Sequence, residues 1–92
     1  MSKGRKRKEW KMTRKVVSNW VDTIICDQRG LDKKNYDRSV EVKRYGVDSI
    51  DEVEILMQIE DDFDIEIPDE KAMSIKTGND AIEVVCSILG VE

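Results

Sequence analysis

Residues 46–70 read GVDSIDEVEILMQIEDDFDIEIPDE, and this stretch decides the fold because it joins a regular apolar pattern to a dense run of acids. Its apolar residues recur at steps of three and four, which predicts an amphipathic helix over residues 49–63. Asp48 comes just before this helix, and acids occupy its first turn, where the helix dipole favours negative charge. The residues expected to face inward are Ile50, Val53, Leu56, Met57, Ile59 and Phe63.

The sequence before this stretch predicts one long helix followed by a long loop. An apolar stripe at helical spacing predicts a helix that runs from a cap at Thr13 to a stop near Gly30. The members of this stripe are Val16, Val17, Trp20, Val21, Ile24 and Ile25. Residues 31–47 carry only single apolar side chains among charges, which is typical of an ordered loop rather than of a strand pair.

The sequence after it predicts two more helices. Pro68, as a first helical residue, opens a short helix over residues 69–74 that buries Ala72 and Met73. A last helix, capped by Asn79 or Asp80, ends at Gly90 and has the inward stripe Ala81, Ile82, Val85, Cys86 and Leu89. We therefore expect an all-α fold: a small four-helix bundle of three main helices and one short helix, with a long loop between the first and second helices.

The charge of the chain divides it into two parts. Residues 1–15 hold eight Lys or Arg and one Glu, whereas residues 16–92 hold eight Lys or Arg and nineteen Asp or Glu. We expect residues 1–12 to be a disordered basic tail and residues 13–92 to form the single domain that a chain of this length allows. A tail that binds nucleic acid or an anionic membrane is the alternative, but the acidic domain disfavours it, and we expect no nucleic-acid partner.

Composition excludes several classes of protein. The chain has no histidine, and its two cysteines, Cys26 and Cys86, are in no metal-ligand spacing, so we expect no metal site and no catalytic residues. No apolar run approaches the roughly 20 residues of a membrane span. The protein is thus expected to be a monomeric, cytoplasmic, non-catalytic protein without a membrane span.

The acids are concentrated around the second predicted helix. Residues 48–70 hold eleven Asp or Glu and no Lys or Arg. From composition alone, this block is either a solvated face that keeps a small domain soluble or a docking surface for basic partners. An EF-hand calcium loop is excluded, because Ile67 stands where such a loop needs glycine.

Two motifs in this block are specific. The chain reads Gly46-Val47-Asp48-Ser49-Ile50-Asp51 and, at a fixed distance, Asp61-Asp62-Phe63-Asp64-Ile65-Glu66-Ile67-Pro68-Asp69. Over residues 14–90 the sequence resembles the acyl carrier protein family, whose attachment motif is Asp-Ser-Leu after a glycine and whose later signature is Glu-Glu-Phe-x-x-x-Ile-Pro-Asp.

The resemblance implies a carrier whose Ser49 is esterified with 4′-phosphopantetheine and which presents acyl intermediates as thioesters in fatty acid or related biosynthesis. The implied partners are a phosphopantetheinyl transferase, which uses coenzyme A and magnesium, and acyl-processing synthases and transferases with basic docking patches. The implied docking residues are Asp48, Asp51, Glu54, Glu60 and Asp61. The implied acyl pocket consists of Val53, Met57, Ile67, Ala72 and Ile75, which can equally be ordinary core residues.

Several residues depart from the family pattern and leave alternatives open. Ile50 replaces the usual leucine, Tyr45 stands where leucine is commonest, and Lys43 and Arg44 occupy positions that are usually acidic. A specialised carrier for polyketide, aryl-polyene, lipid-modification or nonribosomal pathways is one alternative. The other is an unmodified interaction module of the same fold, in which Ser49 only caps the second helix.

Overall fold

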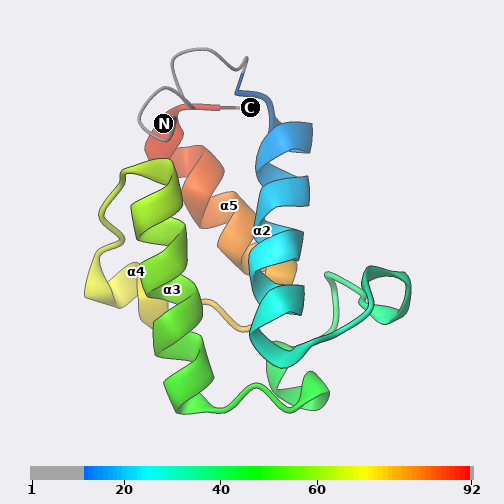
Figure 1. Ribbon diagram of the computed structural model, residues 1–92. Coiled ribbons are helices and arrows are strands. Elements are labelled where there is room, and N and C mark those ends of the chain that lie inside the picture. The colour runs from blue at the N-terminus through cyan, green and yellow to red at the C-terminus, as the bar shows by residue number, and fades with distance from the viewer. Residues whose placement is uncertain (1–11, 92) are drawn as a thin grey trace.

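The computed structural model describes residues 12–91 (Figure 1). The predicted disorder of the basic tail therefore concerns residues that lie almost entirely outside the described part of the chain. Met12, which we assigned to the tail, is half-buried against the core, so the packed domain includes it. The described elements are the helices α2 (Arg14–Arg29), α3 (Ser49–Phe63), α4 (Asp69–Met73) and α5 (Gly78–Leu89), with short 3₁₀ turns η2 (Lys33–Asn35) and η3 (Val42–Tyr45).

The expected small all-α bundle is confirmed, and α2 is its central element. Helix α2 packs against both α3 and α5, as Figure 1 shows, while the short α4 packs Ala72 against the edge of the core. The Thr13 side chain caps α2 by accepting the Val16 N–H, and Gly30 ends the helix in the left-handed conformation, as the sequence predicts. Helix α3 has the predicted bounds of residues 49–63.

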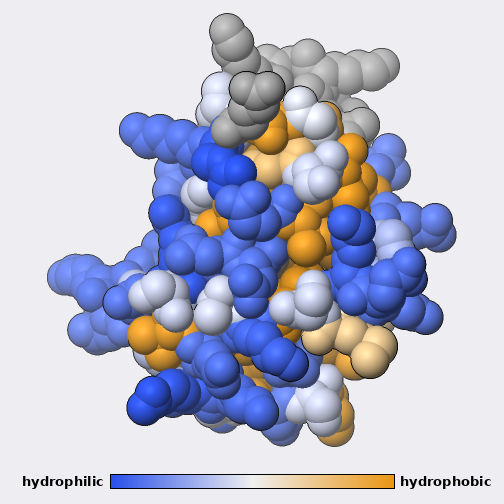
Figure 2. Space-filling model, turned by 180° about the vertical axis from the view of Figure 1, so that it is seen from behind, coloured by the Kyte–Doolittle hydropathy of each residue, from blue (hydrophilic) through white to orange (hydrophobic). Residues whose placement is uncertain are grey.

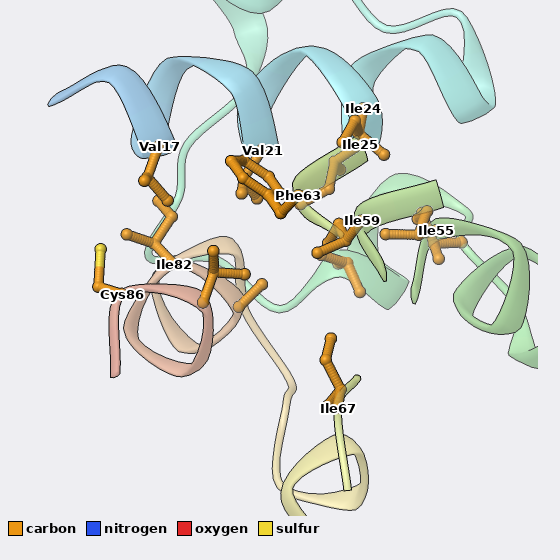
Figure 3. Close-up of a cluster of buried hydrophobic side chains, with 14 residues drawn as sticks. Val17, Val21, Ile24, Ile25, Ile55, Ile59, Phe63, Ile67, Ile82 and Cys86 are labelled. Carbon is orange, nitrogen blue, oxygen red and sulfur yellow. The ribbon is translucent and has the colours of Figure 1, made fainter. Parts of the chain in front are cut away.

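The core is a cluster of aliphatic side chains around a single phenylalanine (Figure 3). Val17, Val21, Ile24 and Ile25 of α2 meet Ile55, Ile59 and Phe63 of α3 and Ile82 and Cys86 of α5. Phe63 is fully buried, and its ring centroid lies 4.9 Å from that of Trp20, whose indole N–H donates to Asp62. Both cysteines are free and buried, and burial raises the pKa of each thiol.

The inward face predicted for α3 is partly wrong. Ile55, Ile59 and Phe63, at four-residue steps, face the core, while the exposed fractions of Ile50, Val53 and Met57 are 69%, 54% and 61%. Helix α3 carries apolar residues on two faces, and α2 covers only the face that contains Ile59. Outside the core, hydrophilic side chains dominate the surface: seen from behind the view of Figure 1, hydrophobic atoms form a narrow band between them (Figure 2).

The last two helices start differently from the prediction. Pro68 is the N-cap of α4 rather than its first residue. Met73 is 76% exposed and Ala72 is half-buried, because a helix of five residues turns only one side toward the core. Helix α5 is capped by Thr77, whose side chain accepts the Asp80 N–H while Asp80 accepts the Thr77 N–H. We had expected Asn79 or Asp80 as the cap, but Asp80 is the third residue of a capping box.

Candidate functional site

Ser49 is the first residue of α3 and is exposed. Within the described residues, its hydroxyl makes no hydrogen bond, and its backbone N–H belongs to the first turn, which lacks intrahelical acceptors. The N-cap is Asp48, whose carboxylate accepts the Asp51 N–H at 2.9 Å. Ser49 therefore does not serve as the helix cap, and its hydroxyl is free to react at the positive end of the helix dipole.

A network around Asp51 holds this helix start in place. The Asp51 carboxylate accepts the Asp48 N–H at 3.1 Å, the Gln28 side-chain amide at 3.2 Å and an Arg29 N–H at 3.5 Å. The Asp48 N–H and the Gln28 amide keep the pKa of Asp51 below its usual value. The end of α2 is thereby fastened to the start of α3, which positions Ser49 rigidly.

The chain that leads into Ser49 is also fixed. Val47 is buried, and Gly46 has a φ of 89°, a left-handed conformation that a side chain would strain. The Tyr45 hydroxyl accepts the Asp37 N–H at 2.8 Å, and the Tyr45 ring lies 5.5 Å from that of Tyr36. Tyr45, which departs from the family pattern, therefore ties the long loop to the approach to Ser49.

The structure separates the predicted docking residues into two groups. Asp48, Glu54 and Asp61 are exposed. Asp51 does not fit a docking role, because it is only 8% exposed and its carboxylate holds the helix start. Glu60 is half-buried and accepts the Ile67 N–H at 2.7 Å, so it also supports the turn that follows α3.

The exposed residues of α3 form one continuous surface, which we call the outer face of α3: Ile50, Val53, Glu54, Met57 and Asp61. Counted from Ile50, the other four residues lie three, four, seven and eleven positions along the helix and therefore share one side of it. Three of the four large hydrophobic residues that are exposed among residues 12–91 lie on this face. The spacing of Ile50, Val53 and Met57 was visible in the sequence, but it predicted that these residues face the interior, so their exposure was not predicted.

A small cavity lies on the opposite, buried side of α3. Its volume is about 40 Å³, and its lining consists of Ile25, Val42, Glu52, Ile55, Leu56, Ala72, Ile75, Thr77 and Ala81. Of the residues predicted for an acyl pocket, Ala72 and Ile75 line this cavity, and Ile67 is buried elsewhere in the core. Val53 and Met57 face away from the cavity, because they belong to the outer face.

Residues 12–91 also bear on metal binding and on membrane insertion. In this part of the chain, no group of three or more Cys, Asp or Glu side chains is arranged to hold a metal ion. None of the helices described here has the length and apolar character that crossing a membrane requires.

The chain matches a known protein family over most of its length. Residues 19–85, which include Ser49, all of α3 and most of α2 and α5, match the family described as "Phosphopantetheine attachment site". The match covers the two motifs that carried the resemblance seen in the sequence.

Proposed function

The chain belongs to the phosphopantetheine attachment site family, and on this premise we propose that Ser49 is the attachment residue. Members of this family carry a covalent 4′-phosphopantetheine group without catalysing a reaction. The observation that carries the proposal is the exposed Ser49 hydroxyl, which has no partner within residues 12–91 while Asp48 caps the helix. When bound, the group supplies a flexible thiol that holds acyl intermediates as thioesters.

The residues around Ser49 fit a phosphodiester. The first turn of α3 presents unpaired backbone N–H groups, and the positive end of the helix dipole favours an anion at this position. The carboxylates of Asp48 and Asp51 are both engaged in the capping box. Because both carboxylates already accept hydrogen bonds from the helix start, we expect the base that removes the Ser49 proton to come from the transferase.

The outer face of α3 is the proposed docking surface for partner enzymes. It starts at Ile50, directly beside Ser49, so an enzyme that binds there has the attachment site within reach. Its apolar stripe supplies buried area, and Glu54 and Asp61 supply charge complementary to a basic patch. Docking residues on such a face give fast, salt-sensitive association, which suits a carrier that visits several enzymes.

We propose fatty acid or related biosynthesis as the pathway, and one observation favours the specialised carrier as a second candidate. The cavity of about 40 Å³ is far smaller than the roughly 150 Å³ cavity that holds benzene. A long acyl chain would therefore enter only if the helices separated. A short cargo fits this mainly apolar interior better. A monomer in the cytoplasm remains our expectation.

The test is the intact mass of the protein before and after incubation with coenzyme A, magnesium and a broad-specificity phosphopantetheinyl transferase. We expect the wild type and the exposed control Ser87→Ala to gain one phosphopantetheine, and Ser49→Ala to gain none. A gain by Ser49→Ala would assign the attachment to another residue. If no variant gains mass where a known carrier does, the unmodified interaction module replaces the proposal. If protein purified from cells already carries more mass than one phosphopantetheine, the additional mass helps to identify the cargo.

A further inference from the structure

Within residues 12–91, the outer face of α3 is left largely exposed, although its Glu54 accepts a hydrogen bond from the Gln28 side-chain amide at 2.6 Å. The three ion pairs in this part of the chain join Arg14 to Glu83, Arg29 to Asp51 and Arg38 to Asp22, so Glu54 and Asp61 are left without a cation. Ile50, Val53 and Met57 are each more than half exposed. Contiguous exposed apolar residues framed by charge mark interaction sites on small proteins.

A shallow groove continues this face toward α2. It has a volume of about 690 Å³ and is lined by Gln28, Glu54, Met57, Gln58, Glu60 and Asp61. The lining contains three carboxylates, one large apolar side chain and no Lys or Arg. The chemistry of the groove therefore selects an occupant with several positive charges and at least one apolar side chain.

The chain contains such a segment. Residues 3–11 read KGRKRKEWK, with six Lys or Arg, one Glu and Trp10. These residues lie outside the part of the chain that the structure describes. Their net charge is opposite to that of the outer face of α3, and Trp10 adds one large apolar side chain.

Residues 3–11 are joined to the described domain at Met12, just before α2. Trp20 of α2 contacts Asp62 and Phe63 at the end of α3, while Gln28 contacts Asp51 and Glu54 at the start, so the two helices are antiparallel, as Figure 1 shows. Met12 precedes Trp20 by eight residues, so it lies about 12 Å beyond the level of Asp62, on the side of the α3 end that carries Asp61. Nine extended residues reach about 30 Å, which exceeds this distance plus the rise of about 10 Å from Asp61 to Glu54 along the helix.

We propose that residues 3–11 bind the outer face of α3 in the same chain, with Trp10 near the α3 end that carries Asp61 and the basic side chains beside Glu54 and Asp61. The tail then competes with basic partner enzymes for this face. The contact itself is independent of Ser49 modification, while the competition rests on the proposed carrier function. A short tether gives the tail an effective concentration of about millimolar at this face. If the dissociation constant of the contact is of similar size, the tail covers the face about half of the time. Partner binding is then weakened about twofold.

The contact is tested by NMR on the full chain. We compare the wild type with a triple variant, Lys6→Gln, Arg7→Gln and Lys8→Gln, and with Trp10→Ala, which keeps every charge. Both variants should shift the signals of Val53, Met57 and Asp61 but not those of α5, and these differences should disappear in about 1 M salt, where the Debye length falls to about 3 Å. Asp61→Asn should reproduce the shifts, whereas the exposed control Asp27→Asn should not.

Three NMR results would overturn the proposal. Identical α3 signals in wild type and tail variants mean that the tail does not touch this face. Shifts that fade on dilution mean that the tail of a second copy binds instead. Shifts that appear only with nucleic acid or anionic vesicles assign the tail to those ligands.

The competition is tested by the rate of phosphopantetheine transfer to the same proteins. The triple variant and Trp10→Ala should both react about twofold faster at low salt and at the wild-type rate in high salt. If the triple variant reacts faster while Trp10→Ala reacts at the wild-type rate, net charge alone changes the transfer rate, and the proposed competition is wrong. If no protein is modified, the proposed function fails, while the NMR result still decides the contact.

Discussion

Two isoleucines on α3 offer a direct test of which side of this helix is buried. Ile59 is 1% exposed and Ile50 is 69% exposed, although the sequence pattern predicts that both face inward. Ile59→Val removes one buried methylene and should cost about 1 kcal/mol, and Ile59→Ala should cost about 2–5 kcal/mol. Ile50→Ala should change stability by less than about 0.5 kcal/mol, because little apolar surface is lost and alanine is the better helix former.

The assay is urea unfolding followed by far-ultraviolet circular dichroism, with the thermal midpoint as a second measurement. For a domain of this size, about 1 kcal/mol corresponds to about 4–8 °C in Tm. An unchanged urea m-value confirms that only stability has changed. Equal destabilisation by Ile50→Ala and Ile59→Ala would refute the reasoning. Transfer of phosphopantetheine supplies the complementary readout: Ile50→Ala should slow it, while Ile59→Val should not.

Two further predictions concern the segment that presents Ser49. The pKa of Asp51 is lowered in the folded state. Its contribution to stability is therefore complete above the unfolded-state pKa of about 3.9 and is lost as the pH falls through the folded-state pKa. Urea midpoints measured against pH should fall less steeply in acid for Asp51→Asn than for wild type or for the control Asp27→Asn. Gly46→Ala should lower the free energy of unfolding in urea by about 1–2 kcal/mol, since φ is 89° at this position. Gly46→Asn should recover part of the loss, because asparagine tolerates the left-handed conformation. Equal stability of the wild type and the two variants contradicts this.

The helix ends show how far local sequence reasoning reaches. The limits of α2 and α3 are confirmed, because the Thr13 cap and the left-handed Gly30 satisfy backbone groups within a few residues of themselves. The cap of α5 was missed because the familiar capping box has Glu or Gln at its third position, and here Asp80 takes that place. Asp80 is also the feature that could have identified the Thr77 cap from the sequence.

The functional site also has one part that the sequence predicts and one part that only the structure shows. The family motif singles out Ser49, and the sequence alone suggested it both as attachment residue and as helix cap. The hydrogen bond from the Asp51 N–H to Asp48 decides against the cap. The role of Asp51, in contrast, depends on Gln28 and Arg29, which are more than twenty residues away in the chain, so no local pattern could show that this acid is internal.

The sequence by itself therefore determined the helical elements, the acidic block and the chemical character of Ser49, because caps, glycines and charge patterns act over a few residues. Only the tertiary structure decided which side of α3 is buried. That helix has one apolar stripe through Ile50, Val53 and Met57 and another through Ile55 and Ile59, and either could face a core. The packing of α2 chose the second stripe, which left the first one exposed beside Ser49 as a surface for binding.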